Sequence, residues 1–481
     1  MTETLPQAFA AAVDRYGDRT ALIEGDGTKV SFSALKYRAD GLAAAWAAKG
    51  IGKGDRILIA MPICADLYAA LAALWSLGAV AVLPEPAMGL NGVRNAVENG
   101  QVKGLCASGA YRLLRFVLPA LWGKPLLHPG QASKSAAPIS DTQPNDLALI
   151  SFTSGTTGAP KAIPRSHAFL MAQARAVSPL LKSDIDEIDL VAFPVFVLIN
   201  LAEGRSSVLP NWKMRHLDRL TSAQLTDWIA KQSVTRLLLP PALCETLADG
   251  TIPANINTIF TGGGPVFPDL IARLKAGKND LRIVSVYGST EAEPIAEHDT
   301  AHTTTDDLTA MKTGKGLLAG FPVPDINLRI TDGEIVVSGQ HVNQGYLDPA
   351  RDAENKRREG DTIWHRTGDA GYLDDQGRLW LLGRWGNVVP TANRPLYPFA
   401  VETAARLWAG VQRAALMHTD QGPILVIEGD AAHRADWTKN ARIFGIDDVR
   451  PISKMPMDRR HYSKIDMATL KKRLPGRQTN G

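Results

Sequence analysis

Short apolar segments recur along this chain and alternate with segments of helical periodicity, and this rhythm limits the folds open to it. Each apolar segment is bounded by residues that favour turns, as buried strands usually are. The clearest examples are RILIAM (56–61), LALISF (147–152), TRLLLP (235–240), NTIFTG (257–262) and LRIVSVYG (281–288). Because strands that alternate with helices favour parallel sheets covered by helices, the sequence predicts an α/β fold of layered sheets.

Two stretches near the N-terminus show how the pattern is interpreted. An amphipathic helix is predicted between Ser33, as its cap, and Gly50, with apolar residues at helical spacing: Leu35, Ala39, Leu42 and Trp46. The most apolar run, residues 67–83, lies at the lower limit for a membrane span. Since Gly78 interrupts this run and Pro84 ends it, we interpret it as a buried helix followed by a strand, and we predict no membrane span.

The length of the chain predicts more than one domain, because 481 residues exceed an ordinary single core. After about residue 330 the segments become short strands joined by Gly and Asp turns, which predicts a small antiparallel β subdomain. The residues beyond Arg384 carry mixed strand and helix signals, as a small α+β domain would. We therefore predict a large N-terminal domain over 1–383 and a small mobile domain over 384–481.

Composition excludes several classes of protein. The 53 basic and 49 acidic residues are spread along the chain, so nothing indicates a nucleic acid partner. Cys64, Cys106 and Cys244 lie far apart and predict neither a disulfide framework nor a zinc site. The N-terminus has no basic start followed by an apolar core, so it is not typical of a secretory signal. A reducing, cytoplasmic location is expected.

The stretch SFTSGTTGAPK (151–161) combines small hydroxylated residues, two glycines and a lysine directly after a predicted strand. Ligands usually bind at the carboxyl ends of strands in such sheets, and consecutive amides with hydroxyl groups can hold phosphate oxygens. The stretch lacks the GxxxxGK[ST] spacing of a mononucleotide P-loop. Taken alone, it is compatible with a phosphate site or with a plain surface loop.

The motifs that follow this stretch identify a protein family more specifically than the stretch itself does. Further motifs follow in order: GGGPV (262–266), YGSTEAEP (287–294), GEIVVSGQHVNQGYL (333–347), HRTGD (365–369), GR (383–384) and HYSKID (461–466). In this order they resemble the adenylate-forming superfamily of acyl-CoA synthetases, peptide-synthetase adenylation domains and luciferases, over nearly the whole chain. The resemblance implies an AMP-forming acid ligase, which attaches a carboxylate to the α-phosphate of ATP and releases pyrophosphate.

The resemblance also implies roles for individual residues. The phosphates of ATP would be held by Thr153, Ser154, Gly155, Thr156, Thr157 and Lys161. Thr290 would touch the α-phosphate, and Glu291 would ligate Mg²⁺, a cation that prefers carboxylate and phosphate oxygens. Lys464 would be the catalytic lysine that reaches from the mobile domain to the reacting carboxylate.

The nucleoside would be bound by a second group of residues in the same resemblance. The adenine slot would be formed by Gly262, Gly263, Gly264, Tyr287 and Gly288. Asp369 would accept hydrogen bonds from both ribose hydroxyls, and Arg384 would contact ribose or phosphate. Without the resemblance, Tyr287 is equally compatible with a core residue and Asp369 with a turn residue.

The chain departs from the family pattern at two places. Gly386 stands where many relatives have an acidic hinge residue, and Pro390 and Asn393 replace a lysine and a glycine, which makes a CoA-binding pose doubtful. Val197 replaces the histidine or aromatic residue of the family's LPxFH motif, which favours an aliphatic acyl group. FTGGGPVFPDL has no aspartate at the place where it could bind a substrate amine, so amino-acid activation is disfavoured.

Three segments resemble one subgroup, the β-lactone synthetases of bacterial olefin and β-lactone pathways: PEPAMGLNGVRNAV (84–97), AFPVFVLINLA (192–202) and MPMDRRHYSKID (455–466). Three functions therefore stay open. The first is adenylation of a fatty or 3-hydroxy fatty acid followed by transfer to CoA or to a carrier protein. The second is closure of a 3-hydroxyacyl adenylate to a β-lactone without CoA. The third is a nucleotide-binding sensor without catalysis, which the complete set of site residues argues against.

Overall fold

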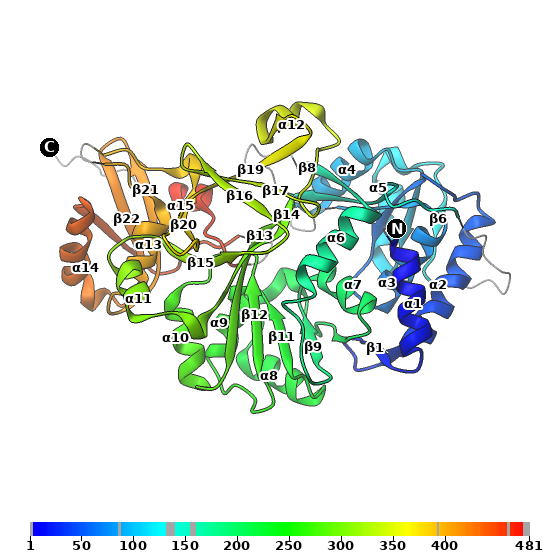
Figure 1. Cartoon of the computed structure of the whole chain (residues 1–481), viewed down its shortest axis with the longest axis horizontal. Coiled ribbons are helices and arrows are strands. Elements are labelled where there is room, and N and C mark those ends of the chain that lie inside the picture. Colours follow the sequence, from blue (N-terminus) through cyan, green and yellow to red (C-terminus); the bar gives the residue numbers. More distant parts are fainter. Residues whose placement is uncertain are drawn as a thin grey trace.

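The computed structural model describes residues 3–84, 88–130, 140–153, 160–391, 394–458 and 462–474. Figure 1 shows the N-terminal segments, coloured blue to cyan, at one end of the molecule and the C-terminal segments, coloured orange to red, at the other. The green and yellow strands between them connect the two ends. The expected α/β class, with a large N-terminal part and a small C-terminal part, is confirmed.

The first sheet has the order β6-β5-β3-β4-β7-β8. Its strands are β3 (Arg56–Ala60), β4 (Val80–Leu83), β5 (Gly104–Ala107), β6 (Leu126–Leu127), β7 (Leu147–Thr153) and β8 (Lys161–Ser166). All neighbours in it are parallel except β7 and β8, which form an antiparallel pair. The predicted phosphate-binding stretch therefore lies between the end of β7 and the start of β8.

The helices of the first third are α1 (Leu5–Tyr16), α2 (Phe32–Ala47), α3 (Ala65–Ser76), α4 (Gly89–Gly100) and the short α5 (Leu114–Val117). Of these, α3 and α4 pack on the first sheet, and α1 and α2 pack on α3. The apolar run over 67–83 is α3 followed by β4, as predicted, and Gly78 has a φ of +67° between them. The predicted cap of α2 was wrong by two residues, because the Ser31 side chain accepts the hydrogen bond from the Ala34 amide. Among the described residues, no helix is both long and apolar enough to span a membrane.

The second sheet begins as a parallel sheet and continues as an antiparallel one, in the order β16-β17-β19-β20-β15-β14-β13-β12-β11-β9-β10-β1-β2. The strands of its first half are β1 (Thr20–Ile23), β2 (Lys29–Ser31), β9 (Ile188–Val191), β10 (Ser206–Val208), β11 (Arg236–Leu239), β12 (Thr258–Gly262), β13 (Arg282–Ser289) and β14 (Ala292–Asp299). The pairing of β12 with β13 is parallel, whereas β14 folds back antiparallel on β13. The tight β13–β14 turn thus lies beside the end of β12.

Helices cover the parallel half of the second sheet: α6 (His167–Val177), α7 (Pro194–Ala202), α8 (Ser222–Lys231), α9 (Pro241–Ala248) and α10 (Pro268–Gly277). Figure 1 shows α8, α9 and α10 around β11 and β12. Their apolar faces share one core, in which Trp228 of α8, Leu243 of α9 and Leu270 of α10 are buried. Burial of such side chains stabilises the layer by roughly 1.5–3 kcal/mol each.

The predicted antiparallel strands are present, but they extend the second sheet instead of forming a separate one. They are β15 (Leu317–Pro322), β16 (Asn327–Thr331), β17 (Glu334–Ser338), β18 (Lys356–Glu359), β19 (Thr362–Leu373) and β20 (Leu379–Arg384), with helices α11 (Thr305–Lys312) and α12 (Pro349–Asn355) between them. The connection is the pairing of β15 with both β14 and β20. Because the sheet is continuous, β19 is placed so that its Asp369 contacts Tyr287 of β13, close to the β13–β14 turn.

A separate three-stranded sheet forms after Arg384, from β21 (Val411–Thr419), β22 (Gly422–Gly429) and β23 (Asp448–Ile452). It packs with α13 (Pro398–Arg406), α14 (Arg434–Ala441) and α15 (Met467–Arg473). This part has a core of its own around the fully buried Trp437. The domain boundary between residues 383 and 384 stays a prediction, and it falls at the end of β20.

Candidate active site

The turn between β13 and β14 carries Thr290 and Glu291 and is held from two sides. The buried Arg165 of β8 donates a hydrogen bond of 2.8 Å to the carbonyl oxygen of Thr290. The backbone amide of Asn343 donates one of 2.7 Å to the carbonyl oxygen of Glu291. These bonds fix the backbone, so both side chains project from a rigid turn instead of a mobile loop.

The carboxylate of Glu291 faces two lysines across the ring of Tyr346. The Tyr346 hydroxyl donates a hydrogen bond of 3.1 Å to Oε1 of Glu291. The ammonium groups of Lys161 and Lys356 lie 5.4 and 5.2 Å from the centre of the same ring. Cations at this distance from an aromatic face are attracted to it. The structure thereby brings Lys161 and Glu291, predicted from separate motifs, into one cluster with Lys356 and Tyr346.

Lys356 is a site residue that the sequence analysis missed. Burial lowers the pKa of its ammonium group to about 8, although the negative charge of Glu291 opposes that shift. Its ammonium group donates to the carbonyl oxygen of Asn343, and the neighbouring Asn355 accepts from Lys161 at 2.7 Å. The only signal in the sequence was its place in the segment between the GYL and HRTGD motifs, where no family motif singled it out.

The predicted ribose residues are brought together. The Tyr287 hydroxyl donates a hydrogen bond of 2.8 Å to Oδ2 of Asp369, and Nε of Arg384 lies 3.3 Å from Oδ1. Burial, and then the charge of Asp369, raise the pKa of Tyr287 well above its ordinary value, so its hydroxyl is a donor at any physiological pH. Asp369 and Arg384 are also direct partners in the β19–β20 register. Because Asp369 and Arg384 are paired across the two strands, the carboxylate of Asp369 lies next to the guanidinium of Arg384.

The glycines of the predicted adenine slot are required by close approach of other groups. A Cβ at Gly262 would lie 2.4 Å from the carbonyl oxygen of Val286, and Gly263 has a φ of +77°. A Cβ at Gly264 would lie 2.6 Å from Cβ of Ser463. The slot therefore has no room for side chains, and the C-terminal part reaches its edge at Ser463.

Lys464 follows Ser463 in the loop that reaches this edge. The Ser463 hydroxyl accepts a hydrogen bond of 3.2 Å from the amide of Ala242 in α9. One oxygen of Asp458 accepts from the amides of Ser463 and Lys464, at 3.0 and 2.8 Å. Tyr462 packs against the core of the large part. The loop is thus docked, with Lys464 exposed directly beyond the contact with Gly264.

Several predicted residues lie outside the described part of the chain. They are Ser154, Gly155, Thr156 and Thr157 of the phosphate stretch, Asn393 of the altered hinge segment and His461. Thr153 ends β7, but its side chain is likewise outside the description. Gly386 and Pro390 precede the small domain, and a Cβ at Gly386 would meet nothing within 4 Å.

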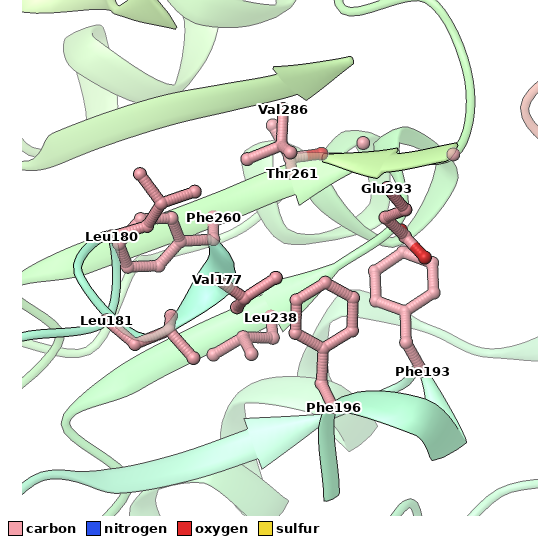
Figure 2. Close-up of a pocket in the computed structure, with 12 residues that line it drawn as sticks. Val177, Leu180, Leu181, Phe193, Phe196, Leu238, Phe260, Thr261, Val286 and Glu293 are labelled. Carbon is pink, nitrogen blue, oxygen red and sulfur yellow. The ribbon is translucent and has the colours of Figure 1, made fainter. Parts of the chain in front are cut away.

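An elongated pocket opens beside Gly262 and Gly263 and is shown in Figure 2. The space between its walls is about 440 Å³ when the open solvent at its mouth is counted. Its walls come from six elements or their ends and are lined by Val177, Leu180, Leu181, Phe193, Phe196, Leu238, Phe260, Thr261, Val286 and Glu293. The aliphatic Leu180 and Leu181 lie at one end, and Phe193 and Glu293 at the other.

Val197, which the sequence analysis associated with an aliphatic acyl group, is not among the residues that line this pocket. Val197 is fully buried in the core beneath α7 and does not line the pocket. Phe193 and Phe196 line it in place of Val197, because residue 196 and not residue 197 falls on the helix face toward β12. The preference for an aliphatic acyl group stays a prediction, and the apolar side chains of this pocket come from other positions.

The donor set can hold one kind of metal ion. Within the described residues, no group of three or more His, Cys, Asp or Glu side chains could hold a metal by itself. Glu291 nevertheless offers a carboxylate on a turn whose backbone is fixed by hydrogen bonds. Mg²⁺ is commonly bound by one or two carboxylates together with substrate phosphates, so these residues fit such an ion.

Comparison with known proteins agrees with this geometry. The model of the AMP-binding enzyme family matches residues 9–347. The chain is 29% identical over 496 aligned positions to an olefin β-lactone synthetase of Xanthomonas campestris pv. campestris, with 91% of this chain and 89% of that protein covered. It is 26% identical to a 2-succinylbenzoate–CoA ligase of Oceanobacillus iheyensis, with 86% of each covered.

A solved structure shares the fold over almost the whole length. It is the O-succinylbenzoate coenzyme A synthetase of Bacillus subtilis in complex with ATP and a magnesium ion, with a TM-score of 0.78 and 22% identity. The superposition covers 96% of this chain and 99% of that one. Since the family model spans well over half of the residues, this chain belongs to the AMP-binding enzyme family and is an adenylate-forming enzyme.

Proposed function

We propose that this enzyme joins an aliphatic carboxylic acid to AMP, with release of pyrophosphate from ATP. The observation that carries the proposal is the largely apolar pocket that Gly262 and Gly263 line at the end of β12, beside the strand pair that carries the Thr290–Glu291 turn. An apolar chain that fills such a pocket points its carboxyl group toward that turn. Burial of each methylene contributes about 0.8 kcal/mol, which is enough to select an acid by its length.

The roles of the site residues follow from their charges. Lys161 and Lys356 supply positive charge for the phosphates, and Glu291 would hold the magnesium ion that neutralises them. Asp369, oriented by Tyr287 and Arg384, would accept from the ribose hydroxyls. These assignments rest on the resemblance of the motifs and on the clustering of their residues.

Lys464 would stabilise the charge that develops as the carboxylate oxygen attacks the α-phosphorus. Its loop already contacts the slot through Ser463. Loss of one preorganised charge typically slows a reaction about 10²- to 10³-fold. We predict that Lys464→Ala loses adenylation by this factor and keeps its affinity for ATP, measured by pyrophosphate exchange and calorimetry. Exchange close to that of the unmodified enzyme would remove Lys464 from the mechanism.

For the second step we propose closure of a 3-hydroxyacyl adenylate to a β-lactone. The support is the similarity to two olefin β-lactone synthetases, each of which covers 91% of the chain. The 3-hydroxyl oxygen would attack the acyl carbon and release its proton to solvent, the bond to the AMP oxygen would break, and AMP would leave with the bonding electron pair. Transfer to CoA is the second candidate, because the 2-succinylbenzoate–CoA ligases are also similar.

The deciding experiment supplies Mg·ATP with fatty acids and 3-hydroxy fatty acids of several lengths, with and without CoA. Products are identified by mass spectrometry, and AMP is quantified. A dehydrated acid formed without CoA supports lactone closure, whereas a product that requires CoA replaces it with thioester formation. Absence of AMP with every acid would overturn the aliphatic substrate.

A further inference from the structure

An exposed apolar segment lies between β5 and β6, at the edge of the first sheet. It consists of α5 with a short helical turn on either side, Gly109–Leu113 and Pro119–Leu121. Five large apolar side chains of this segment are exposed, and together we call them the β5–β6 patch: Tyr111, Leu113, Phe116, Val117 and Trp122. The largest of them, Phe116 and Trp122, are 67% and 64% exposed. Single exposed apolar side chains are ordinary, whereas a group of them indicates an interaction surface.

The same segment is anchored to the sheet by other side chains. Leu118 and Leu121 are each 2% exposed and belong to the core that also contains Leu105 of β5. The exposed side chains are therefore not needed to fill this core. Leu113, Phe116 and Val117 are three and four residues apart, which places them on one helix face. The patch is thus a fixed apolar surface turned toward solvent.

Positive charge accompanies the patch. The sequence from residue 99 to residue 140 contains five Lys and Arg residues and no Asp or Glu. Burial, and then three positive charges, lower the pKa of the His128 imidazole just after β6. The charges belong to Arg112, Lys49 and Arg115, so all three lie near that ring. A partner for this surface therefore has to be negatively charged as well as apolar.

An anionic lipid surface meets both requirements. The guanidinium of Arg115 lies 5.4 Å from the ring centre of the exposed Phe116, so charge and apolar surface adjoin directly. Basic residues beside Trp, Phe and Leu are typical of segments that lie in a membrane interface. Protruding side chains can enter an acyl layer without a matching pocket. A second copy of the chain in a two-fold contact would instead bring the same positive charges together.

We propose that the β5–β6 patch docks this enzyme on an anionic lipid surface, with Phe116 and Trp122 among the acyl chains and Arg112 and Arg115 at the phosphate groups. Figure 1 shows α5 and β6 at the N-terminal end of the molecule and α14 at the opposite end. The docked enzyme would therefore keep its small C-terminal domain away from the lipid. This inference goes beyond the proposed reaction and does not depend on which acid is activated.

The test is sedimentation of the full chain with vesicles of phosphatidylcholine alone or of an equal mixture with phosphatidylglycerol. The enzyme should bind the mixed vesicles much more tightly, and added salt should weaken this binding because it screens the charges. Phe116→Gln/Trp122→Gln should lower the partition coefficient about 100-fold, because two large apolar side chains no longer enter the acyl layer. Arg112→Gln/Arg115→Gln should lower it about 10- to 30-fold, as expected for two cations near an anionic surface.

Matched controls change residues at the other end of the molecule. Ile443 in the small domain is 75% exposed, so Ile443→Gln removes an equally exposed apolar side chain. Lys471→Gln/Lys472→Gln in α15 removes two exposed positive charges. Both control variants should bind like the unmodified enzyme. Leu113→Gln/Val117→Gln is an independent pair within the patch and should also weaken binding, and circular dichroism confirms that each variant is folded.

Each other outcome overturns the proposal. No binding to the mixed vesicles, or an equal loss in the patch variants and the controls, would show that the patch is not a lipid-binding surface. Equal binding to both kinds of vesicle would remove the role of the arginines. A dimer in sedimentation velocity that Phe116→Gln/Trp122→Gln dissociates, without vesicle binding, would assign the patch to a second copy. Absence of both vesicle binding and dimer would assign it to an acidic protein. Because adenylation is not measured, none of these results bears on the proposed function.

Discussion

The ammonium groups of Lys161 and Lys356 both lie over the ring of Tyr346, and that of Lys356 is largely removed from solvent. Lys356 donates to the carbonyl oxygen of Asn343 and lies near both Glu291 and Lys161. A buried lysine is usually retained for a charge partner or a chemical task. The β- and γ-phosphates of ATP would supply such a partner beside Lys161.

We predict that Lys356→Met reduces kcat/KM for AMP formation about 10- to 100-fold at pH 7, because a charged hydrogen bond to phosphate is lost. The pKa of Lys356 is about 8, so its proton is present below that pH and is lost above it. The difference between the unmodified enzyme and the variant should therefore shrink between pH 7 and pH 9.5. Pyrophosphate release measures it, with the exposed Lys312→Met as control. A constant ratio across this range would contradict the assignment.

Glu402 in α13 is a buried acid that the mechanism does not use. Its Oε1 accepts a hydrogen bond of 2.9 Å from the Leu416 amide, and burial raises its pKa from 4.5 to about 7. The folded protein thus binds the proton up to about pH 7, whereas the unfolded chain releases it near 4.5. The contribution of this group to stability falls as the pH rises between these values and is constant above them.

Glu402→Gln should therefore raise the midpoint of thermal unfolding at pH 8 and change it little at pH 4.5. The glutamine keeps the acceptor for Leu416 and removes a cost of at most about 3 kcal/mol. Unfolding followed by circular dichroism at both pH values measures the effect. The exposed Glu98→Gln is the control, and an equal shift at both pH values would argue against a buried neutral acid.

At the scale of elements, the strands were predictable and the contacts between them were not. Each of the five apolar segments named from the sequence is a strand, because a short apolar run bounded by turn residues has few alternatives. The pairing of β15 with β14 and β20, which continues the sheet, depends on contacts distant in sequence. Lys356 escaped notice for the same reason, since its contacts with Glu291, Lys161 and Tyr346 come from other elements.

The β13–β14 turn tolerates little change at Gly288. A Cβ there would lie 2.9 Å from the carbonyl oxygen of Ala292 and 3.2 Å from Cα of Glu293. Both contacts are with backbone, so Gly288→Ala must spread the turn that carries Thr290 and Glu291. A displacement of about 1 Å in a reacting group costs roughly 10²-fold in rate. We predict that loss in pyrophosphate release, with the thermal midpoint only slightly lowered.

Gly52→Ala is the matched control for this variant. A Cβ at Gly52 would meet nothing within 4 Å, and its backbone needs no positive φ. Its rate should equal that of the unmodified enzyme. A Gly288→Ala enzyme with full activity would show that the turn adapts, and that its geometry does not limit the reaction.

At the scale of the whole molecule, an ionic contact holds the C-terminal part against the helices of the second sheet. Arg406 of α13 donates two hydrogen bonds to Asp269 of α10, at 2.8 and 2.7 Å, and lies 3.4 Å from Glu245 of α9. Its guanidinium also stacks 4.6 Å from the ring centre of Phe267. Arg413 pairs with the same Glu245. This contact fixes the arrangement in which Ser463 meets Gly264 beside Lys464.

Breaking this contact should lower adenylation without touching the site. Arg406 is 7% exposed, so Arg406→Met keeps the apolar stem but leaves Asp269 without its bidentate partner. Each 1.4 kcal/mol of lost docking energy reduces the docked population about tenfold relative to the undocked one. We predict at least that decrease in pyrophosphate release, with faster proteolysis in the segment 385–391 that links the two parts.

A double-mutant cycle distinguishes a specific contact from a general loss of stability. Asp269→Asn alone should resemble Arg406→Met, and the double variant should be no slower than either single one, because both remove the same interaction. Arg442→Met in the small domain, whose ion pair with Asp447 is exposed, should be neutral. Additive losses in the cycle would mean that Arg406 and Asp269 act independently. Arg406 would then stabilise the docking of Lys464 through its contacts with Glu245 and Phe267 and not through Asp269.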